Sequence, residues 1–516
     1  MATIASNFFQ GHTQKMPCPI FKKLQLSKFI ILCFLTLYSI ADQPQWGEKH
    51  SRNMVSHDAA PPVSSNTNYQ LSLKWKAELG TQTYSTPVIS NGKVLIGSNN
   101  DNPRHTCCVG DMGVLFCFDE NTGKFLWQLA IPKLKSDIFL DWPHTGLVSP
   151  VTVENNKVYL LSNRGEVLCL DLNGMMDGNS GPITNEFELF GWISTTNNES
   201  IKTLADVIWR FDIVDQLKVH THDGQHSSIL IDDNFLYLNT PNGVDNTHLK
   251  ILSPEAPSLI VLNKNNGSLV AVDNEKLAKN FIHANWSSPA IGTVNGQKLV
   301  IYGGGDGIIY AFKALNKTNV HNTPLFLEKI WWFDCDPSAP KENVHKWQDN
   351  RKEGPSTIYS MPVFLDNKVF ITVGGDPWHG KPISWIKCIN AAMSGNITTN
   401  GELWSFQMPS HCVTTPSIID KFIFLADWSG TVYCLDKDSG KELWTHKPGG
   451  EIWASTLACD KKVYVATRRG NLVVYKATNT CEVLCSMRLD APVSATPVIA
   501  NGKLFVATMT TLYCFQ

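Results

Sequence analysis

The sequence lacks an excess of charge of either sign. Among its 516 residues, 44 lysines and arginines balance 46 aspartates and glutamates, so the formal net charge is −2 at pH 7. Proteins that bind nucleic acids need clustered basic residues to neutralise phosphates. Because this chain has no basic excess, we expect no nucleic-acid partner.

The start of the chain also lacks an apolar run long enough to cross a membrane comfortably. The run Phe29–Ile40 is shorter than the roughly 20 residues of a transmembrane helix. Basic residues precede it and small residues end it, as in a signal peptide. These flanking residues are Lys22, Lys23, Lys28, Ser39 and Ala41. We predict that residues 1–41 are a signal peptide or, alternatively, an uncleaved membrane anchor. The mature protein would then start near Asp42 and be periplasmic or secreted, touching a membrane only through an uncleaved N-terminal segment.

The rest of the sequence is dominated by one repeated unit. Each copy has a Ser/Thr-x-Pro step, an apolar strand, an Asn/Asp turn, a second strand, a glycine, a third strand and a final turn. The clearest copy runs from Thr414 to Trp444. The copies begin at Ser85, Ser149, Ser227, Ser287, Ser360, Thr414, Ser455 and Ala495. The last starts lie about 40 residues apart, a length that four short strands with their turns would fill.

These repeats predict an all-β fold. A four-stranded sheet cannot bury both of its faces alone, but sheets that pack face to face in a ring can. The last copy stops at Gln516 after its third strand, whereas the strand Leu73–Leu79, which carries Trp75, precedes the first copy. We therefore predict an eight-bladed β-propeller of four-stranded antiparallel blades over residues 71–516, closed by this N-terminal strand in the last blade. Residues 42–70 are polar, and we expect them to be flexible.

The turn pattern Asp-x-x-Thr/Ser-Gly-Lys-x-x-Trp, followed by Ser/Thr-x-Pro, resembles the pyrroloquinoline-quinone (PQQ) repeat family. The resemblance covers Leu73–Gln516, and the opening Gln43–Gly47 with Arg52-Asn53 also resembles exported bacterial proteins of this class. The family includes quinoprotein alcohol dehydrogenases and a repeat lipoprotein of outer-membrane assembly. It therefore implies either a binding or scaffold module at the cell envelope, or a quinone-dependent oxidoreductase acting on alcohols or sugars. The fold alone does not decide between them.

The ring geometry predicts a ligand site. Innermost strands line the central channel of a propeller, so residues just before each Ser/Thr-x-Pro step should reach one mouth at equal height. These candidates are Tyr84, His226, Asn285, Trp286, Tyr359, His411 and Trp453. Their polar and aromatic side chains suit a small molecule, a saccharide or a protein partner. The alternative is that the tryptophans plug the channel and the histidines satisfy backbone groups.

A quinone site would need further residues. Quinoprotein methanol dehydrogenases hold an adjacent-cysteine disulfide against the cofactor, and Cys107-Cys108 resembles that pair, although two ordinary thiols are the alternative. Asp306 with Asn285 would hold Ca²⁺, and Arg468 would pair with a quinone carboxylate. Residues 42–516 contain no Cys-x-x-Cys-His for haem attachment. We expect the isolated protein to hold no PQQ tightly, with PQQ and Ca²⁺ as the alternative.

Two further hypotheses concern metal and acid–base chemistry. His220, His222 and His226 could bind a metal together with His283 or His411. The insertions Leu172–Gln225 and Lys313–Thr357 carry histidines and carboxylates that would suit a hydrolase or lyase. Asp306, Asp376, Asp427 and Arg468-Arg469 follow second strands, and we expect them to surround the opposite mouth or to line the ring.

Overall fold

The computed structural model describes residues 41–61, 71–134, 137–194, 197–316 and 323–516. The predicted signal peptide lies outside the described residues except for Ala41, and so do residues 62–70. Among the residues that are described, no helix is both long enough and apolar enough to span a membrane.

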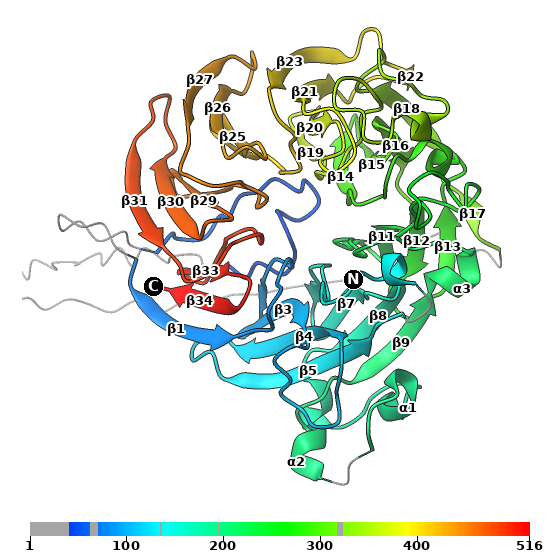
Figure 1. Ribbon diagram of the computed structural model, residues 1–516, viewed down its shortest axis with the longest axis vertical. Coiled ribbons are helices and arrows are strands. Elements are labelled where there is room, and N and C mark those ends of the chain that lie inside the picture. Colours follow the sequence, from blue (N-terminus) through cyan, green and yellow to red (C-terminus); the bar gives the residue numbers. More distant parts are fainter. Residues whose placement is uncertain (1–40, 62–70, 135–136, 195–196, 317–322) are drawn as a thin grey trace, which may run out of the picture. The chain divides into compact units, whose positions relative to one another are not determined.

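The strands of the described part form eight sheets, and successive sheets follow one another round a ring (Figure 1). Each sheet corresponds to one sequence repeat and is called blade 1 to blade 8 in chain order. The first strand of each blade lies innermost, and all pairings within the four-stranded blades are antiparallel. The predicted propeller is therefore confirmed.

Blade 1 comprises β2 (Val88–Ser90), β3 (Lys93–Asn99), β4 (Met112–Asp119) and β5 (Phe125–Pro132), and blade 2 comprises β6 (Thr152–Glu154), β7 (Lys157–Leu161), β8 (Glu166–Asp171) and β9 (Val207–Asp212). Blade 3 comprises β10 (Leu230–Asp232), β11 (Phe235–Asn239), β12 (Leu259–Asn263) and β13 (Leu269–Val272). Blade 4 comprises β14 (Ala290–Val294), β15 (Gln297–Gly303), β16 (Ile308–Lys313) and β18 (Lys329–Asp334).

Blade 5 comprises β19 (Val363–Leu365), β20 (Lys368–Gly374), β21 (Ser384–Asn390) and β23 (Glu402–Met408), and blade 6 comprises β24 (Ser417–Ile419), β25 (Phe422–Ala426), β26 (Val432–Asp436) and β27 (Glu442–His446). Blade 7 comprises β28 (Leu457–Cys459), β29 (Lys462–Ala466), β30 (Asn471–Lys476) and β31 (Val483–Arg488). Blade 8 comprises β32 (Val498–Ala500), β33 (Lys503–Ala507), β34 (Thr511–Phe515) and β1 (Leu73–Glu78).

Short elements decorate this scaffold. β17 (Leu325–Phe326) and β22 (Gly395–Asn396) add parallel fifth strands to blades 3 and 4. The helical segments are α1 (Glu186–Phe190), α2 (Asn198–Ile201), α3 (Ile213–Leu217), and the 3₁₀ turns η1 (Ile138–Leu140), η2 (Gly174–Asp177), η3 (Leu277–Asn280) and η4 (Val344–Trp347).

The ring closes as the truncated ends of the repeat predict. β1 pairs antiparallel with β34, and Trp75 lies opposite Cys514. The Trp75 indole donates a hydrogen bond across the blade interface to the carbonyl of Glu120 (2.9 Å) in blade 1. Gly123 follows Glu120 in the same turn and has a positive φ of 70°. A Cβ at Gly123 would lie 2.6 Å from the Trp75 ring. The Gly and Trp of the repeat are thus packing partners in neighbouring blades.

Apolar side chains fill the spaces between blades. One buried cluster joins blades 4 and 5 through Ile301, Trp331, Ile371 and Ile389, and equivalent clusters lie between other neighbouring blades. Each sheet therefore buries both faces against its neighbours, which supplies the apolar burial that a lone sheet lacks.

The segment 42–58 differs from the expected flexible tail, because it lies against the inner strand of every blade (Figure 1). The inner-strand residues that it bonds or bridges are Ile89, Val153, Ile231, Ile291, Phe364, Ile418, Ala458 and Ile499. Arg52 is fully buried and donates to the carbonyls of Trp46, Ser228 and Pro289. The polar residues that suggested a solvated tail instead pair with backbone groups inside the ring.

Candidate functional site: a cavity at one mouth of the ring

The site lies where two sets of loops meet at one face of the ring. In an antiparallel blade, the second strand ends on the face where the first strand begins. Loops after second strands therefore share a mouth with the residues that precede each Ser/Thr-x-Pro step. Asp376 accordingly bonds Tyr359, and Arg468 donates to Ser494 Oγ (2.6 Å). Of the two alternatives expected for Asp376 and Arg468, a place around the opposite mouth is therefore wrong.

A cavity of about 730 Å³ occupies this mouth. Among the described residues that line it, six are tryptophan: Trp46, Trp142, Trp286, Trp378, Trp428 and Trp453. Every blade contributes a residue from the start of its repeat, namely Tyr84, Pro150, His226, Trp286, Tyr359, Val413, Trp453 and Thr496. The cavity therefore lies on the axis of the ring. Trp46 belongs to the segment 42–58, so this segment forms part of the cavity wall.

The structure brings five of the seven sequence-predicted mouth residues to the cavity, namely Tyr84, His226, Trp286, Tyr359 and Trp453. Asn285 and His411 do not line it. The Asn285 side chain points into the blade, where it accepts a hydrogen bond from the Tyr302 hydroxyl. His411 Nδ1 lies 2.9 Å from the carbonyl oxygen of Gly375, so that this histidine satisfies a backbone group.

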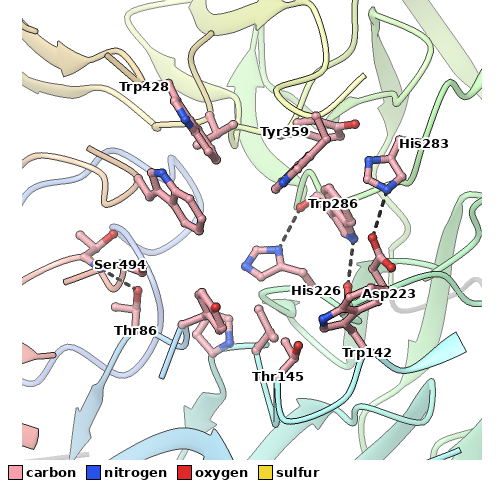
Figure 2. Close-up of a pocket in the computed structure, with 18 of the residues that line it drawn as sticks. Thr86, Trp142, Thr145, Asp223, His226, His283, Trp286, Tyr359, Trp428 and Ser494 are labelled. Carbon is pink, nitrogen blue, oxygen red and sulfur yellow. Dashed lines mark hydrogen bonds and ion pairs between the residues drawn. The ribbon is translucent and has the colours of Figure 1, made fainter. Parts of the chain in front are cut away.

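Aromatic rings form two opposing walls. Trp428 and Trp453 stack with centroids 4.4 Å apart, and Tyr84 is nearly parallel to Trp453. On the other side, Trp286 packs against Tyr359 at 5.0 Å. Figure 2 shows Trp428 on one side of the space and Tyr359 and Trp286 on the other. Such walls can hold a flat or apolar ligand face, or a cation, between rings.

A histidine between two carboxylates forms the polar wall. His283 Nε2 lies 3.1 Å from Asp223 Oδ2 (Figure 2). On its other side, His283 Nδ1 lies 3.1 Å from Asp376 Oδ2. Burial opposes protonation of His283, but Asp376 and Asp223 outweigh it and raise the pKa of His283 to about 9. Burial likewise opposes ionisation of Asp376, yet His283 holds its pKa well below the usual range. The Tyr359 hydroxyl also donates to Asp376 (2.5 Å).

Further histidines extend this wall. His222 Nε2 lies 3.0 Å from His248 Nε2, and the His379 ring lies within 5.1 Å of His283 and 4.7 Å of His248. Burial lowers the pKa of His222 to about 3 and also lowers that of His248, so both imidazoles are neutral.

Of the sequence-predicted metal set, only His222 and His283 belong to this cluster. Asp223 has a left-handed backbone conformation (φ 54°), so the chain turns sharply after His222. His226 consequently points elsewhere, with Nδ1 3.0 Å from the Trp286 carbonyl. His220 lies outside the cluster. Sequence reasoning missed His248 and His379, whose signal was a histidine in a loop that follows a second strand.

The residues predicted for a quinone do not assemble. Cys107 and Cys108 are buried free thiols with their Sγ atoms 3.4 Å apart, and neither lines the cavity. Their loop instead packs against the insertion that carries α1, where Ile193 N bonds the Cys107 carbonyl (3.0 Å). Asp306 is buried within its own blade, where it accepts from the Tyr310 hydroxyl (2.7 Å).

Arg468 comes closest to the cavity, since its guanidinium lies 4.4 Å from the centroid of the Trp453 ring. Arg468 nevertheless does not line the cavity, and none of the described residues that line it is lysine or arginine. PQQ carries three carboxylates that need cationic partners. The residues present therefore do not fit PQQ.

The comparisons with known proteins agree with the fold. Residues 428–514 match the family described as outer membrane protein assembly factor BamB. Over 124 residues the chain is 23% identical to the tetrathionate hydrolase of Acidithiobacillus ferrooxidans. That stretch is 22% of this chain and 25% of the hydrolase, so the chain spans about a quarter of the length of this curated relative.

Solved structures show the same architecture. BamB from Moraxella catarrhalis superposes with a TM-score of 0.55, covering 87% of this chain and 100% of its own at 10% identity. The computationally designed Ika8 protein gives a TM-score of 0.51 over 86% of this chain and 99% of its own, at 11% identity. The repeats, the ring of blades and these likenesses identify the chain as an eight-bladed β-propeller that is similar in fold to BamB and matches the BamB family model over residues 428–514.

Proposed function

We propose that this protein is an exported binding module whose mouth cavity takes a small neutral or cationic organic molecule. The observation that carries the proposal is the cavity of about 730 Å³ lined by six tryptophans among its described residues. A volume of this size matches the pockets that bury small ligands. The match to an outer-membrane assembly factor supports a location at the cell envelope.

The charge of the polar wall selects the ligand class. The carboxylates of Asp223 and Asp376 flank one protonated imidazole, that of His283, so this triad carries a net negative charge. No lysine or arginine is found among the described residues of the lining. Anions are therefore disfavoured, whereas aromatic faces stabilise cations and the apolar faces of neutral molecules such as sugars.

Binding can be tested on the purified full chain by tryptophan fluorescence with three classes of probe: neutral sugars, quaternary ammonium compounds and organic dianions. We expect saturable quenching by a member of the first or second class and none by the dianions. Trp378→Ala should weaken that binding at least about tenfold, which corresponds to the ~1.4 kcal/mol of one aromatic contact.

Trp378 suits this test because it is 41% exposed, so that its removal leaves the core intact. The matched control is Trp332→Ala, which removes a part-buried tryptophan from the outer strand β18, away from the cavity. Equal quenching in wild type and Trp378→Ala, or preferential binding of dianions, would rule out the proposed site.

A further inference from the structure

We infer that His222, Asp223, His248 and His283 form a binding site for one divalent transition-metal ion of the zinc class. One potential ligand atom from each of these residues lies within 4.8 Å of the others. The inference rests on the positions of these atoms. Binding would displace the proton of His283, and the two charges of the ion would then balance the carboxylates of Asp223 and Asp376.

The spacing of the ligand atoms fits tetrahedral coordination. Bonds of about 2.0–2.1 Å in a tetrahedron place neighbouring ligand atoms about 3.3–3.4 Å apart. The Nε2 atoms of His222 and His248 are 3.0 Å apart, and Asp223 Oδ2 lies 3.6 Å from His222 Nε2 and 3.1 Å from His283 Nε2. These three separations bracket the ideal value and the remaining pairs lie within 4.8 Å, so side-chain rotations would admit the ion.

Three separate segments of chain build the cluster, and the fold holds them in place. His222 and Asp223 end the insertion before β10, His248 comes from the loop between β11 and β12, and His283 precedes β14. The side chains of His222 and His283 are almost fully buried, whereas His248 is partly exposed on the cavity wall. Phe139 stacks on His222 with its ring inclined by only 8°, which fixes the imidazole plane.

The surroundings of the cluster resemble the outer shell of a metal site. Ligating histidines usually donate their second ring N–H to a carboxylate or carbonyl, and Asp376 takes this position behind His283 Nδ1. Asp223 Oδ1 and His222 Nδ1 are buried without a hydrogen-bond partner in the described structure. Buried polar atoms rarely lack partners, so the hydrogen bonds within the protein do not fully satisfy the polar groups of this cluster.

Asp376 itself is better suited to the outer shell than to direct coordination. Its Oδ1 accepts the backbone N–H groups of Trp378 and His379, and its Oδ2 faces His283 and the Tyr359 hydroxyl. The alternative cluster of His283, Asp376 and His379 would have to break these bonds. The site with His222 and His248 leaves these Asp376 bonds intact. It replaces the His222–His248 and His283–Asp223 hydrogen bonds, whose atoms would become the ligands, and releases the protons between them.

The ligand set also selects the metal. Three imidazoles and one carboxylate suit Zn²⁺ and other late first-row ions, whereas Ca²⁺ and Mg²⁺ prefer oxygen ligands throughout. Asp223, His248 and His283 line the cavity, so the ion would be adjacent to a bound organic molecule.

The test uses the full chain, stripped of metal with a chelator and titrated with Zn²⁺ alone by calorimetry. The exposed thiol of Cys481 is a competing ligand, so every variant should carry Cys481→Ser. We expect one ion per chain and binding weakened at least about 100-fold by His248→Ala. Asp376→Asn should weaken binding about 10–100-fold, as outer-shell changes do.

His220→Ala is the matched control, because His220 is two residues from His222 and outside the cluster. Circular dichroism and thermal unfolding verify that each variant is folded. His248→Ala should stay folded, because the His248 side chain is partly exposed. The visible spectrum of the Co²⁺-loaded protein reports the ligands directly, with intense bands expected for tetrahedral nitrogen and oxygen coordination. Absence of stoichiometric Zn²⁺ binding to the folded wild type, or equal binding by His248→Ala, would overturn the inference.

Discussion

The tryptophans of the outer strands and those of the mouth cavity differ in what they contact. Trp127 on β5 is fully buried, and its indole donates to the carbonyl of Leu172 in the next blade (3.0 Å). Trp378 and Trp428 lie in loops after second strands and face open space on the axis of the ring. The first group occupies a fixed position in the repeat, whereas Trp378 and Trp428 do not. One residue type thus holds the scaffold together in one region and forms a binding surface in the other.

The largest expected effect is on the scaffold. Trp127→Ala should lower the free energy of unfolding by about 3–5 kcal/mol, because it leaves a cavity between blades and an unpaired carbonyl. Trp378→Ala should lower it by less than about 1 kcal/mol, since the side chain is 41% exposed. Denaturant titration of both variants measures the difference, and similar losses would mean that the two regions do not differ as described.

A second scaffold effect concerns the segment inside the ring. Arg52→Ala should lower the free energy of unfolding by about 2–4 kcal/mol, because the buried carbonyls of Trp46, Ser228 and Pro289 lose their donors. Lys49→Ala is the control, since its side chain is 59% exposed. A stability of Arg52→Ala close to that of the control would show that this segment contributes little to the fold.

A third effect depends on pH and tests whether Asp306 contributes to stability and not to ligand binding. Burial raises the pKa of Asp306 to about 6 from an ordinary value of 3.8. The folded state therefore holds the Asp306 proton more tightly than the unfolded state does. The contribution of protonated Asp306 to the free energy of unfolding is complete below pH 3.8 and is lost as the pH rises through 6. Relative to Asp306→Asn, the wild type should lose about 2–3 kcal/mol between pH 4 and pH 7.

Denaturant titrations of both proteins at several pH values give this difference directly. A difference between the two proteins that stays constant from pH 4 to pH 7 would mean that Asp306 does not titrate in this range. Unchanged ligand binding by Asp306→Asn would agree with its position inside blade 4, away from the cavity lining.

The smallest expected effect concerns the quinone. Incubation of the full chain with PQQ and Ca²⁺ should produce no stable absorbing complex and no dye-linked oxidation of alcohols or sugars. The reason is that Cys107, Asp306 and Arg468 do not line the cavity. Turnover that disappears in Trp286→Ala would instead support the oxidoreductase hypothesis.

The scaffold could be predicted from the sequence because its signals recur. Eight repeat starts set the blades, and the unmatched Trp75 strand predicted the closure with β34. The same register led to Tyr84 and Trp453, because residues at equal repeat positions reach equal height in a ring. It failed for Asn285, since neighbouring residues of an extended chain point in opposite directions and Trp286 takes the side facing the cavity.

The polar wall could not be predicted in the same way. His248 and His379 lie in loops without a repeat register, so nothing in their spacing relates them to His283. The left-handed conformation of Asp223 also directs His226 away from His222, although the two are close in sequence. Where loops that are distant in sequence meet to form a site, the sequence gives the residue types but not the distances between them.

The most direct test of the account is diffraction from crystals grown with Zn²⁺, measured at the zinc absorption edge. The central claim is that the chemistry of this propeller is located in the loops of one mouth. We predict a single strong anomalous peak within about 2.2 Å of ligand atoms of His222, Asp223, His248 and His283. Well-ordered density for these four residues without such a peak, or with the zinc bound elsewhere, would contradict it.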